Sequence, residues 1–326
     1  MRVILLGPQR RPTVDAVARY HALGVSGPVA VVTAGWQERE PDDAELIRLL
    51  GGRAVNLSLY RRWRDVQERD PEYFAGERRL AEALAELQDL YLLRLDYALR
   101  AVYALQRRDS SGRVSGRVSG LASGLAGAEA EALAEALASV RELDAEHLRR
   151  VNGARLEFFE RLPPHERPAI AEHRAEVSRL LGSASGVVIA GGHVGVLAGV
   201  LHLLNVGAAL HSAAGLSAVV AWSAGAMALT DRIVLFHDRS PQGPGHPEVY
   251  GSGLSVVRDL VLLPHARARL LLDDAARMAV FARRFSPARC LLLERGSRIE
   301  LENGSFWPSG IRVIGEDGHV TSVEAA

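Results

Sequence analysis

A serine stands where an apolar stretch of the chain ends and a run of small residues begins. Residues 218–222 read Ala-Val-Val-Ala-Trp, and Ser223 is followed directly by Ala224, Gly225 and Ala226. This order is typical of a buried strand that turns tightly into a helix and raises one hydroxyl at the turn. The small neighbours permit the unfavourable serine backbone, and the N–H of Ala224 can face an oxyanion. The pattern predicts a nucleophile, and a buried strand followed by an ordinary Ala/Gly-rich helix is the structural alternative.

Two residues that could activate a serine follow further along the chain. Residues 233–237 read as a strand that ends at Asp238, and the apolar run 260–263 ends at a proline followed by His265. A serine nucleophile requires a base that takes its proton, and the base requires an acid that fixes its tautomer. All of these residues fall at strand ends, where loops carry chemistry on a rigid scaffold. We therefore expect His265 and Asp238 to complete a catalytic triad with Ser223.

A pair of glycines upstream could supply the rest of an oxyanion hole. Residues 186–192 read Gly-Val-Val-Ile-Ala-Gly-Gly, which predicts a buried strand that runs into Gly191 and Gly192. Because glycine has no Cβ, the backbone N–H groups at these positions can approach a ligand closely. We expect one of them to act together with the N–H of Ala224 on a developing negative charge.

Three short motifs in the second half of the chain resemble one family of serine peptidases. They are W-S-A-G-A at 222–226, G-G at 191–192 and P-H at 264–265. They are similar to motifs of aspartyl dipeptidase (dipeptidase E) and cyanophycinase, in the class I glutamine amidotransferase-like superfamily, and the resemblance covers about residues 186–306. It implies a flavodoxin-like α/β fold, with Ser223 as nucleophile, His265 as base and no cofactor. An α/β-hydrolase also orders Ser, acid and His along its chain, but its oxyanion glycines lie further before the nucleophile.

The resemblance also bears on the acid and on the substrate. The dipeptidase branch carries an Asp fifteen residues after its serine, and Asp238 stands at that spacing. Glu294, before a short hairpin, resembles the family's acidic position near the C-terminus and is a second candidate for the acid. His193 stands where the family usually has Asn beside the substrate, so a preference for aspartyl substrates does not carry over. The candidate substrate-binding residues are His193, Trp222, Arg239, Arg267 and Arg269.

The histidines near Asp238 in the sequence are residues of a type that can bind a metal ion. His237, His246 and Glu248 flank the expected acid, but their spacing matches no zinc pattern, so we expect no metal. The segment 240–253 is rich in Gly and Pro. We expect it to lack regular structure and to shape the mouth of the site.

The first 57 residues alternate short apolar strands with helical segments, which predicts a doubly wound, mostly parallel sheet. A polar loop at 35–40 follows the second strand, at the carboxyl end where such sheets bind ligands. Trp36, Gln37 or Arg39 then lines the substrate cleft, unless this is an ordinary exposed loop.

The middle of the chain changes character to long helices with a Leu/Ala stripe. We expect residues 1–76 and 183–326 to form the α/β core and residues 77–182 to form a large helical insertion, with a Ser/Gly-rich linker at 110–127. The apolar faces of the insertion require burial against the core, each other or a second copy. Packing or homodimerisation is the expected role, and a lid that restricts substrate size is the alternative.

The composition excludes several classes of function. Lys and Arg together number 39, as do Asp and Glu, so the net charge is zero and argues against binding to nucleic acid or a membrane surface. All 39 cations are Arg, which rules out a Schiff-base lysine or a Ser-Lys dyad in this chain. A single Cys permits no internal disulfide, and a cytoplasmic location fits. The sequence thus predicts a serine hydrolase that cleaves a small peptide or amide, and a non-catalytic scaffold with a partner-binding insertion is the alternative.

Overall fold

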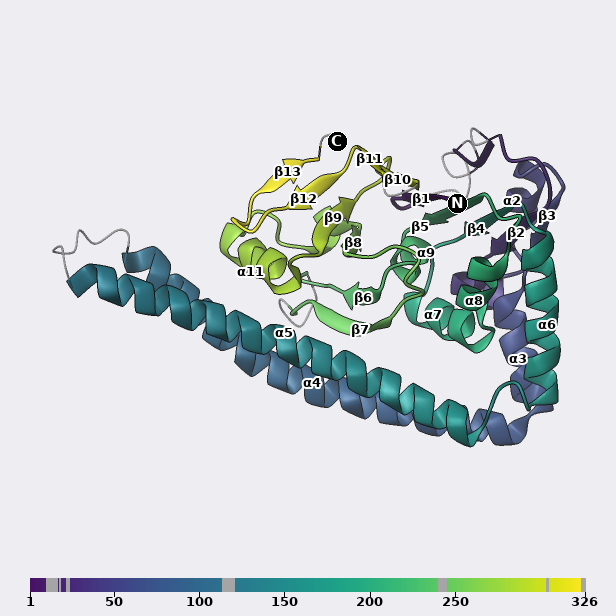
Figure 1. The fold of residues 1–326 in the computed structure, drawn as a ribbon, viewed down its shortest axis with the longest axis horizontal. Helices are drawn as coiled ribbons and strands as arrows, with labels where there is room; N and C mark the ends of the chain where they lie inside the picture. The colour runs from purple at the N-terminus through teal and green to yellow at the C-terminus, as the bar shows by residue number, and fades with distance from the viewer. Residues whose placement is uncertain are drawn as a thin grey trace.

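A largely parallel sheet forms the centre of the molecule (Figure 1). The computed structural model describes residues 1–9, 17, 19–21, 24–112, 121–239, 245–302 and 305–323, with side chains except at 109–112 and 121–126. In this sheet the order is β11-β10-β1-β5-β4-β2-β3, and only β10 runs antiparallel to the other strands. The bounds are β1 Arg2–Leu6, β2 Val29–Val32, β3 Ala54–Asn56, β4 Gly186–Ile189, β5 Ala218–Trp222, β10 Arg298–Glu302 and β11 Ser305–Ser309.

The central strands are apolar on both faces because helices cover both. Every residue of β2, β4 and β5 is buried. Val188 and Val220 share one core with helix α2 (Ala44–Leu49). Their neighbours Val187 and Val219 share the other core with the helices α6 (Pro168–Ser183), α7 (Val194–Leu203) and α8 (Val206–Ser212). Such two-sided burial is the usual setting of parallel strands and fixes their carboxyl ends as one rigid edge.

A second sheet carries the part of the chain that follows Ser223. Its order is β13-β12-β9-β8, with β8 (Leu260–Pro264) and β9 (Arg289–Leu293) parallel to each other. The remaining strands are β12 (Arg312–Ile314) and β13 (Val320–Ser322), and the helix α11 (Ala275–Phe285) lies beside them. The predicted α/β class and the largely parallel central sheet agree with the structure. Strands β8 and β9 lie outside the central sheet and form a sheet of their own with β12 and β13.

A strand forms in the latter part of the segment 240–253, which was expected to lack regular structure. Strand β6 (Arg232–Leu235) pairs antiparallel with β7 (Glu248–Ser252), so the expectation of no regular structure was wrong for the latter part. In β7 the buried positions alternate with half-buried ones, and this alternation outweighs the local Gly and Pro content. Residues 240–244 lie outside the described part of the chain.

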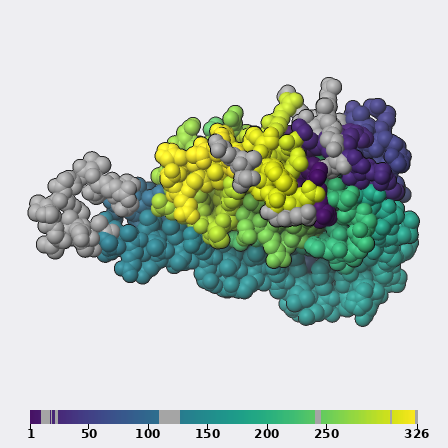
Figure 2. All heavy atoms as spheres, turned by 45° about the horizontal axis from the view of Figure 1, so that its top comes forward, coloured from purple at the N-terminus to yellow at the C-terminus, as the bar shows by residue number. Residues whose placement is uncertain are grey.

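Two long antiparallel helices form an arm along one side of the α/β body (Figure 1). After α3 (Leu59–Arg69), helix α4 spans Pro71–Gly112 and α5 spans Leu121–Arg161. Figure 2 shows the pair, in blue and teal, running beneath the green and yellow C-terminal part. The linker predicted at 110–127 is shorter than expected because both helices extend into it; residues 113–120 lie outside the described part.

A buried ionic network fixes the arm to the body. The Arg284 guanidinium of α11 donates to both carboxylate oxygens of Asp144 in α5, at 2.7 Å each. It also donates to the Pro247 carbonyl at 2.6 Å and to the Tyr91 hydroxyl of α4 at 2.8 Å. The Tyr91 hydroxyl in turn donates to Asp144 and accepts the N–H of Val249 in β7. Because the paired charges also have further hydrogen bonds, the network can hold four elements together in the interior.

Helices α7 and α8 contain no Asp, Glu, Lys or Arg. None of the described helices alone has the length and composition needed to cross a membrane. Helices α7 and α8 meet these criteria only when they are taken together, and the pair is bent by 63°.

Candidate active site

The backbone at Ser223 has the strained geometry expected of a nucleophile elbow. Ser223 follows β5 and precedes α9 (Ala224–Ala228), with φ 51° and ψ −120°. Its own N–H donates to the Leu6 carbonyl at 3.1 Å, and its carbonyl accepts from Met227 at 3.1 Å. A Cβ at position 225 would lie 2.6 Å from the Ile189 carbonyl oxygen, so only Gly225 lets α9 pack this closely. Both sides of the elbow therefore hold the serine in a conformation that costs energy.

The glycine pair lies against the elbow on one side and against the loop after β2 on the other. A Cβ on Gly191 would come within 3.0 Å of the Ser223 Cβ. Gly192 has φ 129°, and a Cβ there would lie 2.2 Å from the carbonyl oxygen of Gly35. That carbonyl accepts the N–H of His193 at 2.7 Å. A side chain at position 191 would collide with Ser223 and one at position 192 with the Gly35 backbone, so both positions require glycine.

Backbone N–H groups are left free around the serine. Among the described residues, the N–H groups of Gly191, Gly192 and Ala224 donate to no other group of the chain. The hydroxyl of Ser223 also has no hydrogen-bond partner there, and its side chain is only partly exposed. Unpaired N–H groups beside a hydroxyl are the arrangement that stabilises an oxyanion formed by attack on a carbonyl.

Parallel pairing of β8 with β9 brings His265 and Glu294 together. The register pairs Pro264, the last residue of β8, with Leu293, the last residue of β9. His265 and Glu294 directly follow these two residues, so they leave the sheet side by side. His265 has φ 60° and donates its N–H to the Leu293 carbonyl at 3.3 Å. One carboxylate oxygen of Glu294 accepts the N–H of Arg267 at 2.7 Å. The carboxylate is thus held in place by the short helix α10 (Ala266–Arg269) that follows the histidine.

The surroundings of His265 favour its neutral form. Partial burial lowers the pKa of His265, the Arg269 guanidinium lowers it further, and the Glu294 carboxylate acts in the opposite direction. A general base functions only when it is unprotonated, so a pKa below the ordinary histidine value keeps the imidazole available at neutral pH.

Asp238, expected as the acid, has no hydrogen bond or ion pair with His265 within the described ranges. One of its carboxylate oxygens pairs with the Arg277 guanidinium at 2.6 Å, and the other accepts the N–H of Leu271 at 3.0 Å. Its side chain is fully buried, and it lines neither cavity at Ser223. Both oxygens are therefore engaged in holding α11 and the chain before it, and the structure brings Glu294 to the histidine instead.

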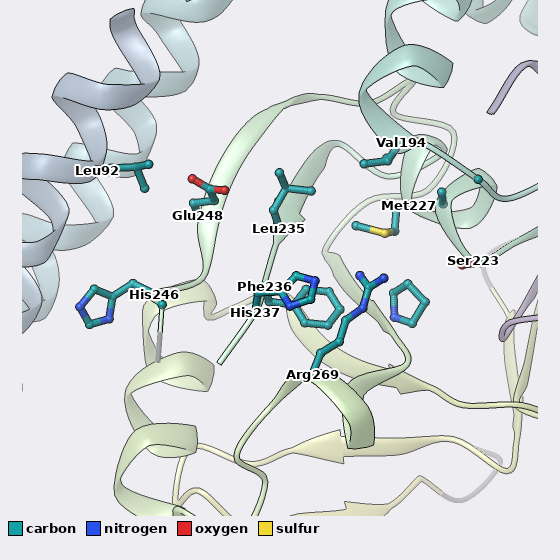
Figure 3. Close-up of a pocket in the computed structure, with 14 residues that line it drawn as sticks. Leu92, Val194, Ser223, Met227, Leu235, Phe236, His237, His246, Glu248 and Arg269 are labelled. Atoms are coloured by element: carbon teal, nitrogen blue, oxygen red, sulfur yellow. The ribbon is translucent and has the colours of Figure 1, made fainter. Parts of the chain in front are cut away.

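Two cavities meet at Ser223. The larger, of about 660 Å³, contains His265 and Glu294 together with Trp36 and Trp222. The smaller, of about 400 Å³, extends from Ser223 to Leu92 of α4 (Figure 3). The residues common to both are Gly192, Ser223 and Arg269. The Arg269 guanidinium lies 5.8 Å from the centre of the Phe236 ring and has no acidic partner in the described part of the chain.

The other candidate substrate-binding residues are distributed unevenly. Trp222 lines the larger cavity, whereas Arg239 is exposed and lines neither. The ring of His193 accepts the N–H of Val196 and caps α7. Arg267 contributes its backbone N–H to Glu294.

The loop after β2 reaches the site through one residue. Trp36, in the 3-10 helix η1 (Ala34–Arg39), lines the larger cavity. Arg39 instead pairs with Asp42 at the surface, at 3.0 Å. Sequence reasoning missed Gln9, which lines the same cavity; its polar side chain just after β1 was the available signal. It also missed Leu92, whose helical stripe gave no indication of a site.

Within the described ranges, no three His, Cys, Asp or Glu side chains gather in a way that could hold a metal ion. His237, His246 and Glu248 all border the smaller cavity, but Glu248 accepts a hydrogen bond from Gln88 at 2.7 Å. His246 contacts Asp96 at 3.4 Å, on the side of α4.

Comparisons with known proteins give structural likenesses but no match in sequence. No protein-family model matches the chain, and no curated protein matches it in sequence. Among solved structures, "Crystal structure of a peptidase from an acI-B1 Actinobacterium" is similar, with a TM-score of 0.46 and 11% sequence identity. The alignment covers 97% of this chain and 91% of that chain. A likeness at this level gives no information about function.

Proposed function

We propose that the protein is a serine hydrolase that cleaves a peptide or related amide bond through an acyl-enzyme. The observation that carries this proposal is Ser223 in strained elbow geometry, beside free backbone N–H groups and within one cavity with His265 and Glu294. Strained backbone of this kind persists only where the surrounding structure enforces it, and it is common at nucleophiles.

In the proposed mechanism, His265 takes the proton of the Ser223 hydroxyl as the oxygen attacks the substrate carbonyl carbon. The N–H of Ala224 and that of Gly192 or Gly191 stabilise the resulting oxyanion. The protonated His265 then gives its proton to the leaving nitrogen, and the C–N bond breaks to leave an ester on Ser223. A water molecule, deprotonated by His265, releases the acid and restores the serine.

Glu294 is the acid in this mechanism. It follows β9 in register with His265, and its charge acts on the pKa of that histidine, whereas the carboxylate of Asp238 is occupied by Arg277. A carboxylate beside the imidazole orients it and stabilises the imidazolium that forms during attack. In the free enzyme such contacts are often loose and tighten when substrate binds.

Arg269 is the candidate for binding a charged group of the substrate. It lines both cavities, is half-buried and has no acidic partner among the described residues. Burial lowers the pKa of Arg269, which reflects the cost of an unpaired guanidinium. A substrate carboxylate would remove that cost by pairing with the guanidinium through two hydrogen bonds.

The test of this proposal is labelling with a fluorophosphonate, which reacts covalently with activated serines. We expect the wild-type protein to be labelled at Ser223, and both Ser223→Ala and His265→Ala to lose labelling while remaining folded. Ser255→Ala is a matched control, because Ser255 also has a positive φ but lines neither cavity. No labelling of folded wild-type protein, or labelling that survives in Ser223→Ala, would reject the proposal in favour of a non-catalytic scaffold.

A further inference from the structure

The smaller cavity at Ser223 has an apolar wall that the catalytic groups do not use. Its volume is about 400 Å³, within the range of small-molecule pockets. The larger apolar side chains that line it are Leu92, Val194, Met227, Leu235 and Phe236, and its polar lining comes from His237, His246, Glu248 and Arg269. Figure 3 shows Leu92 at the end near α4 and Ser223 at the opposite end. We propose that this cavity binds the acyl group of the substrate and that this group is bulky and apolar; the inference rests on the function proposed above.

The position of His265 determines which half of the substrate enters which cavity. The imidazole must reach the leaving nitrogen to protonate it, so the leaving group lies on the side of His265. His265 lines the larger cavity and not the smaller one. Ser223 and the oxyanion donor Gly192 line both cavities, and the oxyanion donor Ala224 lines only the smaller one. The acyl carbonyl therefore sits at the junction, and the rest of the acyl group extends into the smaller cavity.

The helical arm builds the far end of this cavity. Leu92 projects from α4, and one helical turn before it the side-chain amide of Gln88 donates to Glu248 at 2.7 Å. Burial raises the pKa of Glu248, and this hydrogen bond satisfies one of its carboxylate oxygens. The apolar length of the cavity is thus bounded by polar groups near α4. An aliphatic acyl chain or a large apolar amino-acid side chain fits this pattern, and the arm acts as a specificity element.

A series of straight-chain p-nitrophenyl esters, from acetyl to octanoyl, measures the acyl preference directly. We expect kcat/KM to rise by about fourfold for each methylene that becomes buried, until the chain reaches the polar end. Leu92→Trp should reduce the ratio of hexanoyl to acetyl kcat/KM, because the indole occupies the cavity. Leu93→Trp is the matched control: Leu93 is 58% exposed on the same helix and should leave the ratio unchanged. A flat series, or a higher rate with a hemisuccinyl ester than with the hexanoyl ester, would overturn the inference.

A binding measurement separates this inference from the proposed catalysis. Calorimetric titration of Ser223→Ala with acetate, butyrate, hexanoate and octanoate requires no turnover. We expect affinity to increase with chain length, and Leu92→Trp in the same background to remove the increase. Chain-length-dependent binding without fluorophosphonate labelling of wild type would retain the apolar site and reject the hydrolase. Labelling of Ser223 with no chain-length dependence in binding or hydrolysis would retain the hydrolase and reject the apolar acyl site.

Discussion

Replacement of Glu294 by Gln tests which carboxylate serves His265. One oxygen of Glu294 accepts the Arg267 N–H at 2.7 Å, and the amide oxygen of a glutamine must take the same place. The amide NH₂ then faces the histidine and presents a donor where the carboxylate presented an acceptor. This favours the tautomer with a proton on the nitrogen that must accept from Ser223. The substitution is nearly isosteric, so the fold should be unaffected.

The expected loss is large because the tautomer is wrong in both the free enzyme and the complex. An amide in place of a triad carboxylate costs on the order of 10³–10⁴-fold in kcat. That loss corresponds to about 4–5.5 kcal/mol of transition-state stabilisation. The assay is kcat/KM for an activated ester at neutral pH, with the rate of fluorophosphonate labelling as a second readout that needs no substrate.

Asp238→Asn is the matched comparison, and it should affect stability instead of activity. The Asp238 side chain is fully buried and that of Arg277 is 12% exposed, so the variant leaves a largely buried guanidinium without its ion-pair partner. We expect the free energy of unfolding to fall by about 3 kcal/mol, with kcat/KM of the folded fraction within about tenfold of wild type. A large loss of kcat/KM in Asp238→Asn, together with near-normal activity in Glu294→Gln, would refute the assignment.

Further predictions concern the oxyanion hole, the pH profile and the helical arm. Gly192→Ala should lower kcat for the same ester by about 100-fold or more. The new Cβ would lie 2.2 Å from the Gly35 carbonyl oxygen, so the backbone must shift and displace an N–H donor of the oxyanion hole. An unchanged kcat would exclude that donor. Arg269→Gln should move the acid limb of the kcat/KM profile of a neutral ester to higher pH, because Arg269 lowers the pKa of His265; a shift to lower pH would contradict this. Arg284→Met leaves Asp144 buried and unpaired, and should lower the free energy of unfolding in urea by about 3–5 kcal/mol; a change below 1 kcal/mol would show that the network does not hold the arm.

Local sequence was sufficient to place Ser223, the glycine pair and His265 at the ends of apolar strands. Each of these positions depends on a short motif whose backbone requirement is visible in the residues themselves. The Ser223 turn requires small neighbours, and Gly192 occupies a φ of 129°. The parallel character of the central sheet likewise followed from alternating apolar strands and helices.

The sequence could not decide which of two carboxylates lies near His265, because that depends on which strands pair. Asp238 and Glu294 both follow apolar strands, and only the register of β8 with β9 places Glu294 next to His265. The separation of β8 and β9 into a second sheet also depends on long-range pairing, which leaves no local signature. Leu92 was missed for a similar reason: on α4 it continues an ordinary apolar stripe, and its role depends on how the arm packs against the body.

The most direct test of the central claim is detection of the acyl-enzyme itself. Wild-type protein is mixed with p-nitrophenyl hexanoate, quenched in acid within the first turnovers, digested and analysed by mass spectrometry. We expect the peptide containing Ser223 to gain the mass of one hexanoyl group, and the Ser223→Ala variant to show no such gain. A hexanoyl group on another residue, or ester hydrolysis that continues in Ser223→Ala, would contradict it.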